Sequence, residues 1–394
     1  MNILFLSRWF PYPPNNGSKI RIFNLLKSLA GEHSVTLVSF TEDTVEPACL
    51  QALQPYCQQV HPVKYRPFQP GRAKALLGFF SKRPRSVVDT FNLEMQATVA
   101  QICTHTRFDA VVASQIDMAP YASQVPHAAK ILEELELTTL YEQYVLETRP
   151  LKKFFARLRW WKLTGYLSEM LAGFKGVTVV SEPERRRLQQ ILPTCRAVEV
   201  IPNGVDTVFN TPGQAEPQPD TLIYSGALSY NANFDAVNYF LQEIFPLILA
   251  SRPNVKFFVT GKLTGVPVEK LPKCDNLTFT GYLDDIRPKI SQSWVNVVPL
   301  RLGGGTRLKV LESLALGTPV VATSKGAEGL DVVPGQDLLL ADTPANFAAA
   351  VLQLLSAPHL RRQLSQNGRK VVEAQYGWEK IGQRFNTFIS TVAE

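Results

Sequence analysis

The stretch PLRLGGGTRLKVLESLALGTPVVATSKGAEG, residues 299–329, decides the fold class of this chain. An apolar run leads into it, and the three glycines at 303–305 let the backbone turn sharply and approach a ligand closely. Apolar residues then recur at helical spacing from Leu308 to Ala315, and Gly317 ends that helix before the next apolar run, Pro319–Thr323. The stretch therefore predicts strand, loop, helix and strand, the unit from which parallel α/β sheets are built.

The loop inside this unit has the chemistry of an anion site. Free N–H groups at the start of the helix, together with Arg301, Arg307 and Lys309, suit a phosphate or a pyrophosphate. Thr306 is expected to cap the helix, and the Glu312 carboxylate could accept hydrogen bonds from a sugar diol. The alternative is a plain glycine-rich turn with a Lys309–Glu312 pair on one helix face. The residues alone leave both interpretations open.

Length and composition predict a globular protein of two or three domains with anionic partners. The chain has 394 residues, 45% of them hydrophobic, and no apolar run approaches the length of a membrane helix. The start, MNILFLSRWF, is expected to be a buried strand and not a signal peptide. The five cysteines and five histidines show no disulfide or metal spacing, which favours an intracellular protein without a metal. The net charge of +7 favours nucleotides, phospholipids or nucleic acid as partners.

The N-terminal half starts with a second β-α-β pattern. Ile3–Ser7 is an apolar strand, a proline-rich loop follows, the helical period runs from Ile20 to Leu29, and Ser34–Phe40 is the next strand. A ligand phosphate could meet the backbone N–H of Gly17 at the helix start, although a turn that needs glycine explains the residue equally well. Arg21 could face the same anion or the solvent.

An acidic cluster follows the strand Ala129–Leu132. Glu133, Glu134 and Glu136 lie just beyond the carboxyl end of that strand, where open α/β sheets bind their ligands. A helix start rich in acids would explain the cluster as well, because the helix dipole favours negative charge there. We therefore keep Glu133 and Glu134 as candidates.

Two stretches, 64–85 and 149–162, interleave Lys and Arg with Leu, Phe and Trp. This pattern favours contact with an anionic membrane surface or an anionic acceptor. Nucleic acid would fit the charge, but no nucleic-acid motif accompanies the stretches, so we expect no such partner. A solvated basic face over a core stripe is the alternative.

The segment 203–220 is rich in Pro, Gly and Gln and is the best candidate linker. Beyond it a strand at Thr221–Ser225, a helix at Phe234–Leu249 and a strand at Val255–Thr260 repeat the order found at the start, so two similar doubly wound lobes are expected. We expect a lobe at 1–202, a second lobe at 203–376 and a terminal helix at 377–394, which either caps its own lobe or crosses back to the first.

Five segments together resemble a known family. They are IPNGVDTVF (201–209), SGALSYNANFDAVNYF (225–240), TFTGYLDDI (278–286), the stretch 299–329 and YGWEKI (376–381). Together they are similar to the retaining glycosyltransferases of family 4, also called group 1. The resemblance implies the GT-B fold, which has two Rossmann-like lobes with an interlobe cleft. It also implies a nucleoside-diphosphate sugar held mainly by the C-terminal lobe, and transfer without a metal.

The resemblance also places the binding residues. Glu312 falls on the second glutamate of the family's E-x7-E motif, which holds the ribose hydroxyls. The backbone of Gly305, Thr306, Arg307 and Leu308 falls where the family's loop meets the pyrophosphate. Gly17 falls on the N-terminal glycine that approaches the same phosphates.

The chain departs from the family pattern at two places in the donor lobe. Gly304 stands where the first glutamate of the motif lies against the donor sugar, and residues 226–234 lack the usual basic pair. We expect Arg307 and Lys309 to compensate as the catalytic cations that stabilise the departing phosphate.

A third departure lies in the N-terminal lobe, where Glu133 and Glu134 follow a strand after which the family often has a histidine. We expect an acid of this cluster to position the acceptor or the transferred sugar.

The resemblance implies a retaining glycosyltransferase that acts on a hydroxyl acceptor. The two basic aromatic stretches favour a lipid-linked or membrane-proximal acceptor, and thus a role in cell-surface polysaccharide or glycolipid assembly. The expected donor is a UDP-sugar, with no further cofactor, and the acceptor is a glycan, a lipid-linked molecule or a small molecule. We expect a cytoplasmic protein that can lie on the inner face of the membrane. The alternatives are a non-catalytic protein of this fold that binds sugar nucleotides or glycans, and a sugar-nucleotide epimerase. A nicotinamide dehydrogenase is disfavoured because both lobes lack the dinucleotide glycine fingerprint.

Overall fold

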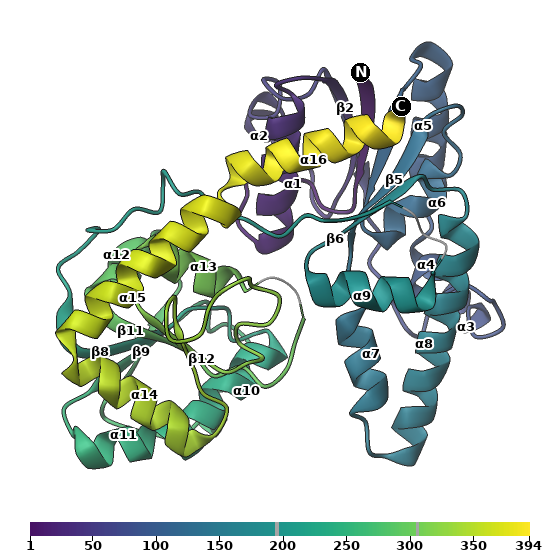
Figure 1. Ribbon diagram of the computed structural model, residues 1–394. Coiled ribbons are helices and arrows are strands. Elements are labelled where there is room, and N and C mark those ends of the chain that lie inside the picture. The colour runs from purple at the N-terminus through teal and green to yellow at the C-terminus, as the bar shows by residue number, and fades with distance from the viewer. Residues whose placement is uncertain (194–196, 305–306) are drawn as a thin grey trace. The chain divides into compact units, whose positions relative to one another are not determined.

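The computed structural model describes residues 1–193, 197–304 and 307–394. Its contacts divide the chain into two units. Unit 1 comprises Met1–Asn203 and Glu379–Glu394, and unit 2 comprises Gly204–Trp378. Each unit has one parallel sheet with helices around it (Figure 1), so the predicted pair of doubly wound α/β sheets is confirmed.

Among the described residues, the sheet of unit 1 has seven strands in the order β3-β2-β1-β4-β5-β6-β7. The strands are β1 Asn2–Ser7, β2 Ser34–Thr41, β3 Gln59–Lys64, β4 Ala110–Ser114, β5 Ala129–Leu135, β6 Gly176–Val179 and β7 Val198–Val200. All of the pairings are parallel, and the strand order reverses between β1 and β4. In open α/β sheets the carboxyl ends beside such a reversal form the ligand crevice.

The helices of unit 1 are α1 Gly17–Leu29, α2 Pro47–Gln51, α3 Ala73–Leu77, α4 Arg85–Thr90, α5 Leu93–His105, α6 Ala119–Ala122, α7 Thr138–Val145, α8 Pro150–Leu171 and α9 Glu182–Ile191, with a 3₁₀ turn at Ile116–Met118. Helix α1 begins three residues before the predicted start at Ile20. The reason is a cap: Asn16 Oδ1 accepts a hydrogen bond from the Lys19 N–H. Gly17 is therefore the first residue of this helix.

Helix α16, Trp378–Ala393, completes unit 1 from the far end of the chain. Its Asn386 side chain donates to the Ser28 carbonyl and to the Glu32 carboxylate, both at 3.1 Å. Phe385 and Ile389 are fully buried on the apolar stripe of the helix. Unit 1 is thus built from two separate parts of the sequence.

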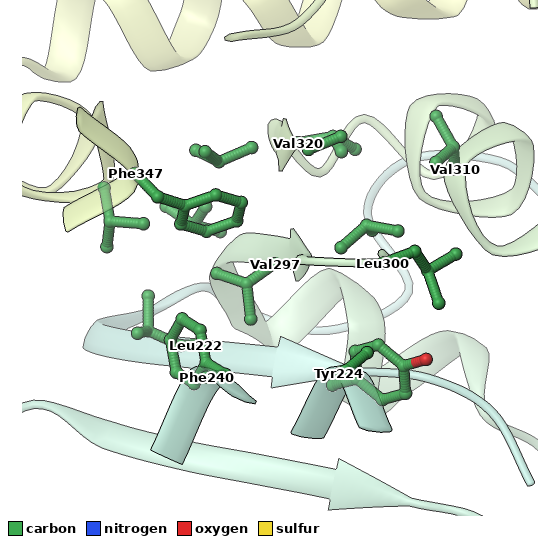
Figure 2. Close-up of a cluster of buried hydrophobic side chains, with 14 of the residues drawn as sticks. Leu222, Tyr224, Phe240, Val297, Leu300, Val310, Val320 and Phe347 are labelled. Carbon is green, nitrogen blue, oxygen red and sulfur yellow. The ribbon is translucent and has the colours of Figure 1, made fainter. Parts of the chain in front are cut away.

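In the part of unit 2 that the structure describes, the sheet has six strands in the order β10-β9-β8-β11-β12-β13. They are β8 Gln218–Tyr224, β9 Lys256–Thr260, β10 Leu277–Gly281, β11 Ser293–Val298, β12 Val320–Ala322 and β13 Leu339–Leu340. The order reverses between β8 and β11. Figure 2 shows the core on this sheet, where Phe240 and Phe347 lie with Leu222, Val297 and Val320.

The helices of unit 2 are α10 Asn231–Tyr239, α11 Phe245–Ser251, α12 Arg287–Gln292, α13 Leu308–Ala315, α14 Pro344–Ser356 and α15 Pro358–Val371, with a 3₁₀ turn at Val268–Lys270 and π turns at Phe240–Ile244 and Val372–Tyr376. The helix predicted at Phe234–Leu249 is divided by the first π turn. Pro246 is the second residue of α11 and has no N–H for the helical ladder, which explains the interruption.

The segment predicted as a linker is fastened to unit 2. Arg369 donates to the Thr207 carbonyl at 2.7 Å, and Arg287 donates to the Phe209 carbonyl at 2.8 Å.

In the described part of the chain, no helix combines the length and the apolar character that a membrane span requires.

Candidate functional site

Glycines with positive φ follow three strands that are neighbours in the unit 2 sheet, at its carboxyl edge. They are Gly226 after β8 (φ +150°), Gly261 after β9 (φ +120°) and Gly303 after β11 (φ +98°). A Cβ on Gly261 would lie 2.5 Å from the Gly226 carbonyl oxygen, so the backbones meet where no side chain fits. The loops after β8 and β11 flank the reversal of strand order. This edge therefore leaves main-chain groups open to a ligand.

The loop that leads into α13 is held by Arg307. Its guanidinium is buried and donates to the carbonyls of Gly303 and Gly304, both at 2.8 Å, and to the Lys325 carbonyl at 3.1 Å. These bonds neutralise two carbonyl dipoles that would otherwise repel an anion at the loop. Arg307 precedes the first helical residue, Leu308, whose N–H is among those without a partner in the helix itself.

Two residues predicted to bind the pyrophosphate, Gly305 and Thr306, lie outside the described residues, as does the predicted cap by Thr306. Glu328 adds a carboxylate next to the loop. Its Oε2 lies 3.4 Å from Arg307 Nη2 and 2.6 Å from Lys325 Nζ. Arg307 thus supports the loop, and its charge is partly balanced by Glu328.

Lys309 reaches across to the end of β8. Its Nζ donates to the Tyr224 hydroxyl and to Asn233 Oδ1, both at 2.7 Å. The Tyr224 hydroxyl also donates to Asn233 Oδ1 at 2.7 Å, and burial raises the pKa of this tyrosine far above its usual value. A Cβ on Gly226 would lie 2.9 Å from Lys309 Nζ. The lysine therefore places an amine that can carry positive charge beside residues 226–234, the segment that lacks Arg and Lys.

The environment of Lys309 sets its charge. Burial, and then the nearby positive charge of Arg307, lowers the pKa of Lys309 to about 7. The alternative Lys309–Glu312 pair is not formed, since no ion pair within 4 Å joins these two described residues. Lys309 can therefore gain a proton near neutral pH when an anion arrives.

Glu312 lies one helical turn further along α13. None of the residues that the structure describes donates a hydrogen bond to its carboxylate. Burial raises the pKa of Glu312 to about 7, and the charge of Lys309 opposes this shift. A partly buried carboxylate without a donor is suited to accept hydrogen bonds from the hydroxyls of a ligand.

Arg301, which the sequence placed in the anion site, has another partner. Its guanidinium pairs with Asp235 at 2.6 Å and lies 4.3 Å from the centre of the Tyr239 ring. The positive charge of this arginine is thus used to fasten the end of β11 to α10.

In unit 1, Glu133 is buried in an ion pair. The side chain has no exposed surface, and its oxygens accept from Arg21 Nε at 2.5 Å and from Ser114 Oγ at 2.7 Å. Arg21 is equally buried and donates to the Pro202 carbonyl at 3.0 Å and to Asn203 Oδ1 at 3.1 Å. The expectation that Arg21 faces the solvent is therefore wrong, because its guanidinium is buried and paired with Glu133. Glu133 does not fit the catalytic role expected of it, because both of its oxygens are held inside the fold.

Glu134 remains a candidate at this edge. Its backbone has φ +59°, Gln115 has φ +72°, and Gln115 Nε2 donates to Glu134 Oε2 at 3.0 Å. Two non-glycine residues in the left-handed region that contact one another are uncommon, and such strain gathers at functional sites. Burial, and then the charge of Glu133, raises the pKa of Glu134. This carboxyl group can hold a proton at neutral pH.

The structure brings Arg307, Lys309 and Glu312 together on one helix start, beside Gly303 and Gly304. Sequence reasoning missed Tyr224 and Asn233, which hold the lysine. A glycine directly after an apolar strand, as at Gly226, is the signal that could have drawn attention to this loop.

Comparison with protein families accounts for most of the chain. Residues 15–209 match the model described as Glycosyltransferase Family 4, and residues 219–357 match the model described as Glycosyl transferases group 1.

Two curated relatives show the range of similarity. A GDP-mannose-dependent monoacylated alpha-(1-6)-phosphatidylinositol monomannoside mannosyltransferase of Corynebacterium glutamicum is 23% identical over 239 residues, which are 55% of this chain and 62% of the relative. An uncharacterized 44.6 kDa protein in the cps region of Klebsiella pneumoniae is 19% identical over 96% of this chain and 97% of its own length. The chain thus spans less than two thirds of the length of the first of these relatives.

Solved structures show the fold. Sucrose-phosphate synthase from Thermosynechococcus elongatus superposes with a TM-score of 0.70 at 17% identity, covering 99% of both chains. Anabaena Alr3699/HepE, solved with UDP and glucose, gives 0.66 at 14% identity, with 99% of this chain and 100% of that chain covered. The two family matches make the chain a member of the family 4 (group 1) glycosyltransferases, and these neighbours show its GT-B fold.

Proposed function

We propose that this chain is a retaining, metal-independent glycosyltransferase whose donor pyrophosphate binds at the loop 303–309. The observation that carries the proposal is the start of α13. There, within one and a half helical turns, Arg307, Lys309 and Glu312 follow a glycine loop at the reversal of strand order. Cations and main-chain N–H groups suit a diphosphate, and a carboxylate without a donor suits the diol of a ribose.

Lys309 has the chemistry for a leaving-group cation. Because burial lowers the pKa of Lys309 to about 7, an approaching diphosphate favours uptake of a proton by the amine. The ammonium group then stabilises the charge that develops on the phosphate as the glycosidic bond breaks. Arg307 acts mainly by holding the loop, and its positive charge adds to that of Lys309.

On the acceptor side, we propose that Glu134 orients the acceptor hydroxyl or the transferred sugar. Its raised pKa lets the carboxyl group donate or accept a hydrogen bond near neutral pH. Gly17 at the start of α1 is proposed to approach the donor phosphates. A cytoplasmic enzyme of polysaccharide or glycolipid assembly fits the family, and the relative from Corynebacterium glutamicum acts on a phosphatidylinositol mannoside.

UDP is our first candidate for the nucleotide, because the neighbour from Anabaena was solved with UDP. GDP is the competitor, since the mannosyltransferase relative is GDP-mannose-dependent. A thermal-shift screen of UDP, GDP, ADP and their common sugar conjugates separates them, because a ligand that binds only the folded chain raises the melting temperature with its occupancy. We expect one base to give the main shift.

The matched variants are Arg307→Ala and, as a control, Lys256→Met, an exposed lysine at the start of β9. Loss of Arg307 should release the loop whose N–H groups face the diphosphate, and should remove about 2–4 kcal/mol of transition-state stabilisation, the range found when preorganised anion-site donors are lost. Transfer rates with EDTA present test metal independence. Full turnover by Arg307→Ala would refute the role of the loop.

A non-catalytic sugar-nucleotide binder is the second candidate, favoured by Gly304 in the place of a carboxylate. A thermal shift without donor consumption, in the presence of a panel of glycan and lipid acceptors, would select it. Conversion of the donor sugar without any acceptor would instead select an epimerase.

A further inference from the structure

The start of helix α8 is exposed on every side. All eight residues from Thr148 to Phe155 are exposed, although a helix of a globular protein normally buries one face. Figure 1 shows α7 and α8 side by side, running away from the sheet of unit 1. The rings of Tyr141 and Trp160, 5.2 Å apart, join the two helices. Residues 145–155, here called the hairpin tip, therefore project from the unit.

The hairpin tip combines large apolar side chains with positive charge. Leu151 is 70% exposed and Phe154 is 62% exposed, values that isolated surface residues reach but that rarely occur together. The other exposed apolar side chains of the tip are Val145, Leu146 and Phe155. Exposed cations without an ion pair among the described residues surround them: Arg149, Lys152, Lys153 and Arg157.

A second apolar and basic segment is fixed beside the same helix. The buried Nζ of Lys162 in α8 donates to the carbonyls of Gly78 at 3.0 Å and Phe79 at 2.7 Å. These carbonyls lie at the end of α3, next to Leu77 and to Phe80, which is 92% exposed. Phe155 lies seven residues before Lys162 and thus on the same face of α8. One lysine therefore joins the two basic aromatic stretches of the sequence.

We propose that the hairpin tip, together with residues 76–80, lies in the interface of an anionic lipid bilayer. The leucines and phenylalanines would enter the boundary between headgroups and acyl chains, and the lysines and arginines would meet lipid phosphates. Charge complementarity favours anionic over neutral lipid, and the exposed leucines favour a bilayer over a purely electrostatic partner. The inference does not depend on the proposed donor chemistry, because membrane contact can be measured without a donor.

The test is co-sedimentation of the full chain with phosphatidylcholine vesicles that contain about 30% phosphatidylglycerol, and with phosphatidylcholine alone. We expect binding to the anionic vesicles that weakens as salt rises. The triple variant Leu151→Ser/Phe154→Ser/Phe155→Ser should lower the partition coefficient by about 100-fold, because three apolar side chains no longer enter the interface. Lys152→Gln/Lys153→Gln should lower it by about 30-fold, at about 1 kcal/mol for each basic residue near the surface.

Two controls match these variants within unit 1. Leu93→Ser changes a leucine that is 71% exposed at the start of α5, and Lys27→Gln/Lys175→Gln removes two exposed lysines elsewhere. Both controls should bind vesicles as the unmodified chain does. The thermal shift produced by the nucleotide reports separately on folding and on the donor site, so a chain that binds vesicles without a nucleotide response would overturn only the proposed function.

Three results would overturn the membrane proposal. The unmodified chain does not sediment with anionic vesicles at low salt, or the triple variant sediments as well as the Leu93→Ser control. The third result is that the unmodified chain does not bind vesicles but forms a dimer, detected by light scattering, and that the triple variant does not form this dimer. That result would assign the hairpin tip to a second copy of the chain.

Discussion

The carboxyl edges of the two sheets are built in opposite ways. In unit 2, the backbone at the edge carries no side chains at three glycines, Gly226, Gly261 and Gly303. Lys309 of α13 extends over this backbone toward Gly226. In unit 1, the edge is filled by the buried ion pair of Arg21 and Glu133, and Ser114 donates to the second oxygen of Glu133. An edge without side chains leaves room for a ligand next to the main chain. An edge filled by a buried ion pair instead makes the fold rigid at that point. The proposed donor site therefore lies at the sheet edge with fewer side chains.

The largest effect should come from breaking the filled edge. Glu133→Gln removes the carboxylate that pairs directly with the buried Arg21 guanidinium and leaves only Glu134, 3.9 Å away, as a counter-charge, so we expect the free energy of unfolding to fall by about 3–5 kcal/mol. Urea denaturation measures the change. The control is Glu199→Gln, which removes an exposed partner of Arg384 in the same unit and should cost less than about 1 kcal/mol. Equal losses in the two variants would contradict the comparison.

Gly261→Ala should be the next most damaging, because its Cβ would meet the Gly226 carbonyl at 2.5 Å in a backbone with positive φ. We expect a loss of about 2–4 kcal/mol in stability. Gly226→Ala makes an instructive partner, since its backbone also has positive φ but its Cβ meets the side-chain ends of Lys309 and Asn233 and no backbone atom. That variant should lose nucleotide affinity more than stability. If both variants lose only stability, the glycine edge is structural and does not bind the donor.

Lys309→Met tests whether the positive charge of Lys309 contributes to nucleotide binding at the glycine edge of unit 2. Affinity for the nucleoside diphosphate should fall by about 10–100-fold, the usual range for a lost hydrogen bond to a charged group. Because the pKa of Lys309 is about 7, the affinity of the unmodified chain should decrease as pH rises from 7 to about 9. Isothermal titration calorimetry at both pH values checks this. A pH dependence that survives in Lys309→Met would assign the proton to another group.

The smallest effect has the opposite sign. Glu312→Gln should raise the free energy of unfolding at pH 8 by about 1–2 kcal/mol. Burial raises the pKa of Glu312 to about 7 from its usual 4.5, so the fold disfavours the ionised form. The penalty is complete above pH 7 and disappears as pH falls toward 4.5. The gain measured at pH 5.5 should therefore be smaller than at pH 8, and equal gains would rule out titration of Glu312 as the cause.

The sequence predicted the two parallel sheets because apolar strands and helical periods alternate in both halves. The start of α13 was also predictable, since three glycines precede a helical pattern. The partners of Lys309 were not: Tyr224 is 85 residues away and Asn233 is 76 residues away. Nor could a pattern show which of two adjacent glutamates, Glu133 or Glu134, is fully buried. That depends on Arg21, 112 residues earlier in the chain.

The C-terminal helix has a consequence for how the protein is made. Unit 1 needs residues from both ends of the chain, since Glu379–Glu394 belong to it. A ribosome finishes the strands of unit 1 long before it adds α16. While unit 2 is synthesised, Ser28 and Gly176 therefore lack the helix that packs on them in the complete fold. A gene fragment that stops at residue 203 would therefore encode an incomplete unit. A fragment for residues 204–378 would encode all of unit 2, and it is the better starting point for studying donor binding alone.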